Sequence, residues 1–460
     1  MNGYADFLAR KRIIDPATGI AQRVELPEFL FPHQRDITQW ALRRGRAAIF
    51  AGTGLGKTLM ELVWANEVSR HTRKPVLLLA PLAVSHQHQR EASQFGITAQ
   101  VVTSRSEGTI DVTNYQKLDR FSVDDFGGVA LDESSILKST DGKYRNKLIE
   151  DCAQVPFRLA ATATPAPNDF MELGNHAEFL GIMSYTDMLA TFFTHDGGDT
   201  QKWRLKGHAE NEFWKWMASW AVMLRKPSDL GYSDKGYDLP PLKRHQHVVS
   251  VDYAPSMDTG LLFPIEARTL QERIAARRDT VEERVAIAAH NTPSDRPFVW
   301  WCNLNSESEA LAKAIPGAVE VRGSDDDTAK ERKLEAFTAG EIRVLITKPS
   351  IAGFGMNWQH CADTGFVGLN DSFEQIYQAE RRFWRFGQKK PVNVHFIAAE
   401  TEGAVVANLK RKEADAERMA AAMVMHMADL SSATVRGMVR DRPDYAPTKP
   451  IILPDFLRAA

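Results

Sequence analysis

A glycine-rich loop that ends in lysine and threonine is the clearest chemical feature of this 460-residue chain. Glycines let backbone N–H groups face a phosphate chain without side-chain clashes, and the N-terminus of a following helix favours negative charge. Lys57 is expected to meet the β- and γ-phosphates of a nucleotide, and Thr58 to hold Mg²⁺. The loop starts at Ala51, and the residues expected to bind the nucleotide are Gly52, Thr53, Gly54, Leu55, Gly56, Lys57 and Thr58.

An acidic pair, Asp132-Glu133, follows an apolar run farther along the chain. A phosphate-binding loop of this kind needs a carboxylate at the end of a neighbouring strand. Asp132 is expected to join the Mg²⁺ shell, and Glu133 to position or deprotonate an attacking water. The pair therefore predicts that the bound nucleotide is hydrolysed. Guanine is not indicated, because Asn146-Lys147 is followed by Ile149 where a guanine-binding motif has aspartate.

The elements that must position these residues follow a strand–helix rhythm. Short apolar runs alternate with longer helical patterns such as 58–70, which predicts a parallel sheet covered by helices. The rhythm breaks and then returns, so two separate α/β domains are the simplest interpretation. The expected strands are 47–50, 76–80, 99–103, 128–131 and 157–160 in the first domain and 298–302, 318–321, 343–347, 365–369 and 392–397 in the second.

The stretch between the two domains is rich in aromatic residues and lacks that rhythm. Amphipathic patterns at 210–224 and 265–290 predict a mostly helical insertion. A long helical pattern follows the second domain, and the last residues, rich in proline, predict an extended tail. The predicted divisions are an extension at 1–27, a first domain at 28–168, the insertion at 169–293, a second domain at 294–400, a helix at 401–440 and the tail at 441–460.

Composition is that of a globular protein, with 43% hydrophobic and 25% charged residues. The sequence shows no long apolar run, so we expect no membrane span. Three widely spaced cysteines argue against a disulfide framework and favour a reducing cytoplasm, bacterial or that of an infected host cell. The formal net charge is only -2, so any nucleic acid must be bound through a local groove rather than a broadly basic surface.

Asp132-Glu133-Ser134-Ser135 resembles the DExx box of the superfamily 2 helicases, which include the DEAD/DEAH-box enzymes. Six other stretches resemble motifs of that family and lie in its order along the chain. The most specific is 378–388, which is similar to the sixth motif, including its terminal Gly-Gln. The other stretches are Pro32-His33-Gln34, Leu79-Ala80-Pro81-Leu82, Thr162-Ala163-Thr164-Pro165 with Asn168, 298–303, and Ser350 with Gly353-Phe354-Gly355-Met356-Asn357.

This resemblance implies roles for individual residues. Gln34 would bind the adenine of ATP, and Gly355 would also lie at the ATP site. Arg382 and Arg385 would act as arginine fingers that stabilise charge on the transferring phosphoryl group. The residues implied to contact nucleic acid, or to couple it to ATP, are Pro81, Thr162, Thr164, Asn168, Gly353 and Asn357.

The sixth motif and the Thr-x-Thr-Pro-x-x-Asn form of the third are similar to the Snf2-like branch of superfamily 2. The resemblance implies two RecA-like parallel-sheet domains with ATP and Mg²⁺ between them, in a motor that tracks along double-stranded DNA. The chain departs from the branch at Ser135, where histidine is usual, and at Ala51-Gly52, where an acidic pair is usual. Its length resembles that of a compact phage or bacterial member rather than a chromatin remodeller.

Three other functions are open on the sequence alone. A strand-separating helicase of DNA or RNA has the same motifs, although no strand-splitting hairpin is obvious in the sequence. A nucleic-acid-binding scaffold with a degenerate ATPase is disfavoured, because every expected catalytic residue is present. The motor could instead load or power a partner, such as a replication or recombination protein, through the insertion and the tail.

Overall fold

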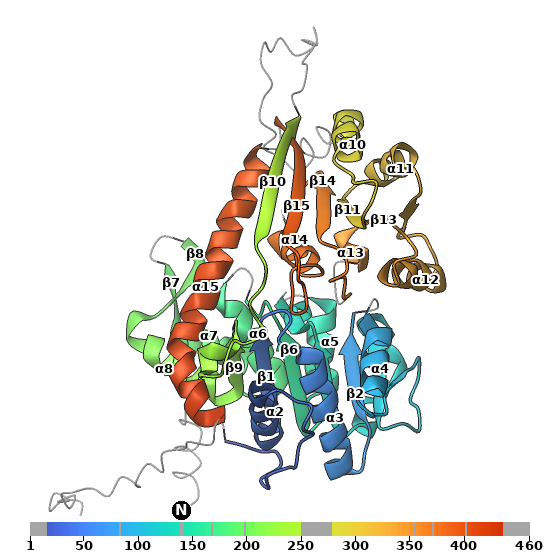
Figure 1. Cartoon of the computed structure of the whole chain (residues 1–460). Helices are drawn as coiled ribbons and strands as arrows, with labels where there is room; N and C mark the ends of the chain where they lie inside the picture. Colours follow the sequence, from blue (N-terminus) through green and yellow to red (C-terminus); the bar gives the residue numbers. More distant parts are fainter. Residues whose placement is uncertain are drawn as a thin grey trace, which may run out of the picture.

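The computed structural model describes residues 16–81, 84–138, 142–166, 169–196, 199–249, 278–352, 356–369, 372–400 and 403–435. Two parallel sheets with helices packed around them dominate these residues (Figure 1). The predicted α/β fold of two RecA-like parallel-sheet domains is thereby confirmed. The beginning of the expected N-terminal extension and the whole of the expected tail at 441–460 lie outside the described residues.

The first domain is built on a seven-stranded parallel sheet in the order β3-β4-β2-β5-β6-β1-β9. Strands covered on both faces are expected to be continuously apolar, as VLLLA in β2 is. The strands are β1 (Arg46–Ala51), β2 (Val76–Ala80), β3 (Gln100–Val101), β4 (Ile110–Asn114), β5 (Gly128–Asp132), β6 (Phe157–Thr162) and β9 (Ala221–Leu224). The helices packed with them include α2 (Pro32–Arg44), α3 (Lys57–Thr72), α4 (Ser85–Gln94), α5 (Lys143–Asp151) and α6 (Leu173–Leu180).

The second domain is built on a six-stranded parallel sheet in the order β10-β15-β14-β11-β13-β12. Every apolar run that was expected to be a strand overlaps a strand of one of the two sheets. The strands are β10 (Leu242–Val249), β11 (Phe298–Cys302), β12 (Ala318–Glu320), β13 (Val344–Thr347), β14 (Asp363–Val367) and β15 (Val392–Ala399). The helices are α10 (Val281–His290), α11 (Asn305–Ala314), α12 (Asp327–Thr338), α13 (Pro349–Ala352) and α14 (Phe373–Glu380).

The stretch 169–293 is less helical than expected, because two of its strands belong to the main sheets. β9 pairs with β1 in the first sheet, and β10 pairs with β15 in the second. The helix expected over 210–224 therefore ends at Trp220, since the next four residues gain a parallel partner strand and full burial. The remaining elements are α7 (Tyr185–Phe192), the antiparallel hairpin β7 (Phe193–Asp196) and β8 (Asp199–Leu205), and α8 (Glu210–Trp220).

Two further strands were not expected because their sequences are polar. β4 carries Asp111 within its buried run, where the carboxylate accepts a hydrogen bond from the Ser106 N–H at 3.0 Å. β10 is an edge strand whose polar side chains are mostly exposed. Of the expected helical run 265–290, residues 281–290 are helical, and 265–277 lie outside the described residues.

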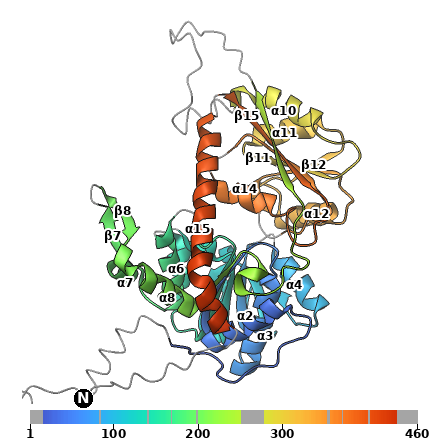
Figure 2. The same ribbon diagram turned by 60° about the vertical axis from the view of Figure 1, so that its left-hand side comes forward.

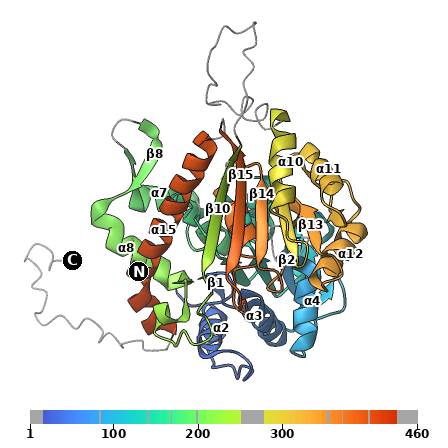
Figure 3. The same ribbon diagram turned by 45° about the horizontal axis from the view of Figure 1, so that its top comes forward.

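A long helix, α15 (Gly403–Val435), runs beside both domains (Figures 1 and 2). Near its start, Glu413 accepts a hydrogen bond from Arg244 of β10 at 2.5 Å. Near its end, Met423 and Met427 are buried in the core of the first domain, and His426 stacks on Trp214 with ring centroids 5.1 Å apart. Figure 3 shows β10 lying between α15 and β15. The helix thus ties the edge of the second sheet to the first domain.

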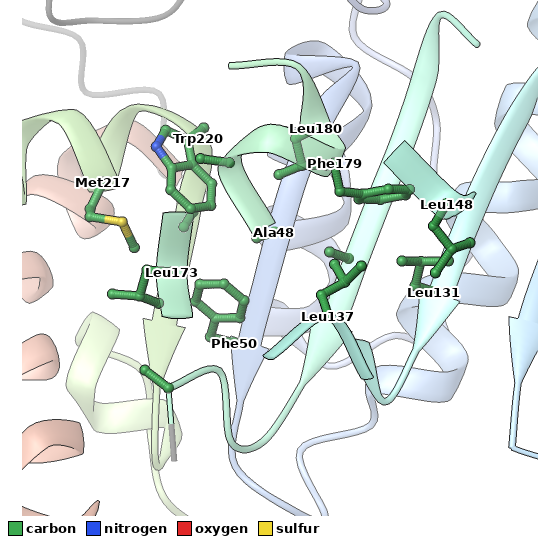
Figure 4. Close-up of a cluster of buried hydrophobic side chains, with 14 of the residues drawn as sticks. Ala48, Phe50, Leu131, Leu137, Leu148, Leu173, Phe179, Leu180, Met217 and Trp220 are labelled. Carbon is green, nitrogen blue, oxygen red and sulfur yellow. The ribbon is translucent and has the colours of Figure 1, made fainter. Parts of the chain in front are cut away.

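Apolar side chains of the first domain form two clusters, and one of them combines residues of the sheet, the helices and the insertion. In Figure 4, Phe50 of β1 lies among side chains from other elements, including Leu173 and Trp220. This packing fixes β1, and therefore the start of the phosphate-binding loop, against the strands beside it. No helix within the described ranges has the length and apolarity that a membrane crossing requires.

Candidate nucleotide-hydrolysis site

The phosphate-binding loop joins the end of β1 to the start of α3. Gly54 and Gly56 have φ values of 88° and 80°, in the left-handed region that other residues rarely adopt. A Cβ at Gly56 would lie 2.2 Å from Gln34 Nε2, and one at Gly54 would lie 2.8 Å from the backbone nitrogen of Phe386 in the second domain. Gln34 Nε2 also donates a hydrogen bond to Leu55 O at 3.0 Å. The loop therefore requires glycine at both positions and is in close contact with the second domain.

Polar groups of the loop converge on the N-terminus of α3. Lys57 Nζ donates a hydrogen bond to Ala51 O at 2.9 Å, which holds the ammonium group against the loop. Thr58 is half-buried in the first turn of α3. The Oγ1 atom of Thr53 is buried without a hydrogen-bond partner in the described part of the chain. The first N–H groups of a helix have no intrahelical partner, so this end of α3 can bind phosphate oxygens.

The acidic pair lies at the carboxyl end of β5, on the same edge of the first sheet as the loop. Asp132 and Glu133 are only 6% and 9% exposed. Burial and the nearby Glu61 raise the pKa of Asp132 to about 6, and burial and Asp132 raise the pKa of Glu133. Glu133 also has a φ of 53°, which is costly for a residue with a side chain. Its environment therefore favours a carboxylate that accepts a proton readily.

Glu133 is held by both domains at once. Thr162 Oγ1 of β6 donates to Glu133 Oε2 at 3.4 Å, and Gln378 Nε2 of α14 donates to the same oxygen at 3.5 Å. Gln378 in turn accepts two hydrogen bonds from Arg382, from Nε to its backbone oxygen at 2.8 Å and from a terminal nitrogen to Oε1 at 2.9 Å. The carboxylate is therefore connected to the third and sixth motifs.

The two arginines of the sixth motif lie at this junction. Burial and the neighbouring Arg385 lower the pKa of Arg382 to about 10. Burial also lowers the pKa of Arg385, while the carboxylates of Glu91, Glu133 and Asp132 oppose that shift. The Nε atom of Arg385 is buried and has no hydrogen-bond partner among the described residues. Such guanidinium groups suit the charge on a transferring phosphoryl group.

The donor set fits ATP and Mg²⁺. Thr58 and Asp132 offer hydroxyl and carboxylate oxygens, which are the ligands that Mg²⁺ prefers. The unpartnered Thr53 Oγ1 and Arg385 Nε are buried donors that phosphate oxygens would satisfy. The residues predicted for the nucleotide from the two domains are thus brought together, with Gly355 outside the described residues.

An aromatic cluster beside Gln34 was missed by sequence reasoning. The ring centroid of Tyr237 lies 4.9 Å from that of Phe386, 5.9 Å from that of Phe31 and 5.5 Å from that of His33. Phe31 adjoins the predicted adenine motif, His33 belongs to it, and Phe386 belongs to the sixth motif, so the sequence pointed to this region. No motif pointed to Tyr237, because it comes from the stretch between the domains.

A cavity of about 640 Å³ adjoins the loop between the two domains and α15. Gly52 lines it, and the Gly52 N–H donates to Leu224 O of β9 at 2.9 Å. Lys57, the acidic pair and Arg385 are not among its lining residues, so the cavity is separate from the acidic pair. Its lining includes Thr53, Leu55, 163–166, Tyr237, Tyr377, Arg381, Trp384, Phe386, 419–421 and 423–425.

The residues predicted to contact or couple nucleic acid are only partly described. Pro81 follows directly after β2. The Thr164 N–H donates to Thr162 Oγ1 at 3.1 Å, which links the third motif to the partner of Glu133. Asn357 Nδ2 donates to Glu91 Oε1 of the first domain at 3.4 Å, across the interface. Asn168 and Gly353 lie outside the described residues.

Two RecA-like domains that share a phosphate-binding loop, an acidic pair and paired arginines define the core of superfamily 2 proteins. No protein-family model matches the chain. The chain is 22% identical over 420 residues to the DNA annealing helicase and endonuclease ZRANB3 of Mus musculus, and 21% identical over 425 residues to the protein of that name from Bos taurus. Each match covers 80% of this chain, which spans 38% of the length of these relatives.

Among solved structures, the chain is similar to the Sulfolobus solfataricus SWI2/SNF2 ATPase core in complex with dsDNA, with a TM-score of 0.40 and 15% identity. That match covers 92% of this chain and 98% of the other. In the order of its motifs and in its similarity to the two curated relatives, the chain resembles Snf2-like proteins of superfamily 2.

Proposed function

We propose that this chain is an ATP-dependent motor that hydrolyses ATP between its two domains and tracks along double-stranded DNA. The observation that carries the proposal is the shared hold on Glu133, by Thr162 of the first domain and Gln378 of the second. Activation of water at Glu133 therefore depends on how the two domains lie against each other. The relatives' names describe a DNA annealing helicase, which supports DNA as the track.

The chain's own groups divide the chemistry among them. Lys57 and the N–H groups of α3 bind the phosphates, and Glu133 accepts the proton of the attacking water. Arg382 and Arg385 stabilise the charge that develops on the phosphoryl group. Mg²⁺, when held by Thr58 and Asp132, neutralises phosphate charge.

The base of ATP would lie against the aromatic cluster. Gln34 holds the loop through Leu55 O, and the rings of Phe31, Tyr237 and Phe386 lie beside it. Aromatic rings of this kind stack on a purine. Because Phe386 belongs to the second domain, binding of the base would draw that domain toward the loop.

Closure and opening of the domains would move the chain along its track. The contact groups are proposed to be Pro81, Thr162, Thr164, Asn168, Gly353 and Asn357. A chain with a net charge of -2 can hold DNA through amides, hydroxyls and a few basic groups, since phosphate contacts need no sequence recognition.

A second candidate is a strand-separating helicase, and one observation favours it. The β7–β8 hairpin, which was not obvious from the sequence, stands away from both main sheets (Figure 2). Ring centroids of His195 and Trp203 on this hairpin are 3.8 Å apart. A projecting hairpin with an aromatic pair could separate the strands of a duplex by stacking on a base.

One set of assays distinguishes these functions. ATP turnover is measured without nucleic acid and with duplex DNA, single-stranded DNA and RNA, followed by triplex displacement and strand separation. We expect turnover to be stimulated most by duplex DNA, with triplex displacement and no unwinding. Unwinding that is lost when β7–β8 is shortened would establish the helicase instead. A rate of ATP turnover that no nucleic acid changes would contradict both functions.

A further inference from the structure

A buried charged cluster of Glu61, His88 and Asp132 lies next to the acidic pair. Glu61 on α3 and His88 on α4 are 0% and 1% exposed. His88 Nε2 lies 3.4 Å from Glu61 Oε2 and 3.4 Å from Asp132 Oδ2. Burial of charged groups costs free energy unless they are paired, so three of them together in a core require an explanation. Neither Glu61 nor His88 belongs to the motifs that define the hydrolysis site.

The contacts of His88 fix the orientation of its ring. Nδ1 lies 3.0 Å from Val84 O, which can only accept a hydrogen bond, so this nitrogen carries a proton. Nε2 faces the carboxylate oxygens of Glu61 and Asp132. His88 is therefore held between a backbone carbonyl and two carboxylates.

The same contacts fix the Asp132 carboxylate. Its Oδ1 accepts a hydrogen bond from the Glu133 N–H at 3.0 Å, and its Oδ2 faces His88. The Tyr115 hydroxyl donates to Asp132 O at 2.7 Å, which anchors the backbone. Glu61 Oε1 has no hydrogen-bond partner within the described residues, and Glu61 Oε2 faces His88 Nε2, so His88 joins Glu61 to Asp132.

We propose that His88, held by Glu61 and Val84 O, is a positioning residue that orients Asp132 toward the Mg²⁺ of the bound nucleotide. This inference rests on the proposed function, in which Asp132 joins the Mg²⁺ shell. Groups that hold a metal ligand in place are worth about 10–100-fold in metal affinity or activity. His88 and Glu61 thus extend the nucleotide site into the core behind β5.

The decisive variant replaces both outer groups with apolar side chains, Glu61→Leu together with His88→Leu. It removes both polar groups of the pair at once. Replacement of a whole buried ion pair by apolar residues is often neutral or stabilising, so the thermal unfolding midpoint should stay near that of the unaltered protein. If the leucine pair does not fold, Glu61→Ala with His88→Phe is the alternative. It removes the same two polar groups and fills the space with the phenylalanine ring.

The measurement is binding of a fluorescent, non-hydrolysable ATP analogue during a Mg²⁺ titration. We expect the apolar pair to raise the half-saturating Mg²⁺ concentration about tenfold or more. Analogue binding in the presence of a chelator should not change, because Lys57 and the free N–H groups at the start of α3 are unaltered. Glu61→Gln with His88→Gln, which keeps hydrogen-bond donors, should restore much of the Mg²⁺ affinity.

The control is Glu307→Gln, which breaks the buried Arg284–Glu307 pair of the second domain, 2.6 Å apart and 0% exposed on both sides. It should lower the unfolding midpoint without a shift in the Mg²⁺ titration. A folded apolar pair with an unchanged Mg²⁺ titration would overturn the positioning role. Absence of Mg²⁺-dependent analogue binding in the unaltered protein would instead overturn the proposed function.

Discussion

Glu133 combines a strained backbone, a buried carboxylate and partners from two domains. Its φ of 53° persists because Thr162 and Gln378 both hold the side chain. A residue held in this way tolerates little change in the position of either domain. In the proposed mechanism, chemistry at Glu133 is thus sensitive to the distance between the domains, whereas phosphate binding at Lys57 uses groups of the first domain.

Glu133→Gln should abolish ATP turnover and leave ATP binding largely intact, because the amide cannot accept the proton of water. Lys57→Ala should lose turnover as well, through the loss of phosphate contacts. Single-turnover kinetics and equilibrium binding of a fluorescent ATP analogue separate the two steps. Turnover of Glu133→Gln at the unaltered rate would remove this residue from the mechanism.

Arg385→Ala should bind ATP but hydrolyse it slowly, with a loss of about 10³-fold or more in the rate of a single turnover. The reason is that its unpartnered Nε is available to the transferring phosphoryl group. Arg411→Ala on α15 is the matched control, since Arg411 is an exposed residue paired with Asp415. A loss of DNA affinity alone in Arg385→Ala would contradict the arginine-finger assignment.

His176 makes the stability of the first domain depend on pH. Burial lowers its pKa from 6.5 to about 4, so the folded protein keeps the ring neutral while the unfolded chain takes up a proton below pH 6.5. Stability should therefore fall as the pH drops from 6.5 toward 4, by about 1.4 kcal/mol per pH unit from this group. Denaturant unfolding at pH 7 and pH 5 should show a smaller loss for His176→Gln. An equal loss in both proteins would contradict the assignment.

The elements around the site differ in how far the sequence predicts them. The loop, the acidic pair and the arginines were predictable, because tight turns and phosphate charge demand particular residue types at short spacing. Tyr237 and His88 were not, because only the fold brings them beside Gln34 and Asp132. Most buried parallel strands were predictable from apolar runs. β4 was not, because polar residues interrupt its buried run, and β9 was not, because its sequence continues a helical pattern. β10 was not, because an exposed edge strand tolerates polar residues.

Met427→Ala should destabilise the first domain by about 2–5 kcal/mol, the usual cost of truncating a large buried side chain. Met427 is 0% exposed on α15, although it lies far along the chain from the other core residues. Met425→Ala on the same helix is the control, because Met425 is 70% exposed and should change stability little. Urea unfolding of the whole chain provides the measurement. Equal effects of the two variants would show that α15 does not pack on the first domain in solution.

Across the whole molecule, exposed ion pairs join α4 of the first domain to α12 of the second. Arg90 pairs with Glu335, and His86 Nε2 lies 3.2 Å from Glu331 Oε1. Each side chain of the Arg90 pair is about half exposed, so the attraction is weak and screened by salt. These two pairs therefore add little to the cost of separating the domains.

Fluorescence energy transfer between dyes on the two domains should report a larger separation at high salt than at low salt. Glu331→Lys with Glu335→Lys should give at low salt the separation that the unaltered protein has at high salt. Arg90→Glu with Glu335→Arg should bring the domains back together. If the charge reversal leaves the separation unchanged at every salt concentration, these pairs do not hold the domains.

The packing of α15 has a consequence for how the protein is made. Met423 and Met427 complete the apolar core that surrounds Trp220. They are synthesised about 200 residues after Trp220. At about 5–20 residues per second, that apolar surface stays uncovered for about 10–40 s while the entire second domain is synthesised. During this interval the nascent first domain exposes apolar surface that a chaperone can bind. If translation stopped before α15, the released chain would keep that surface exposed.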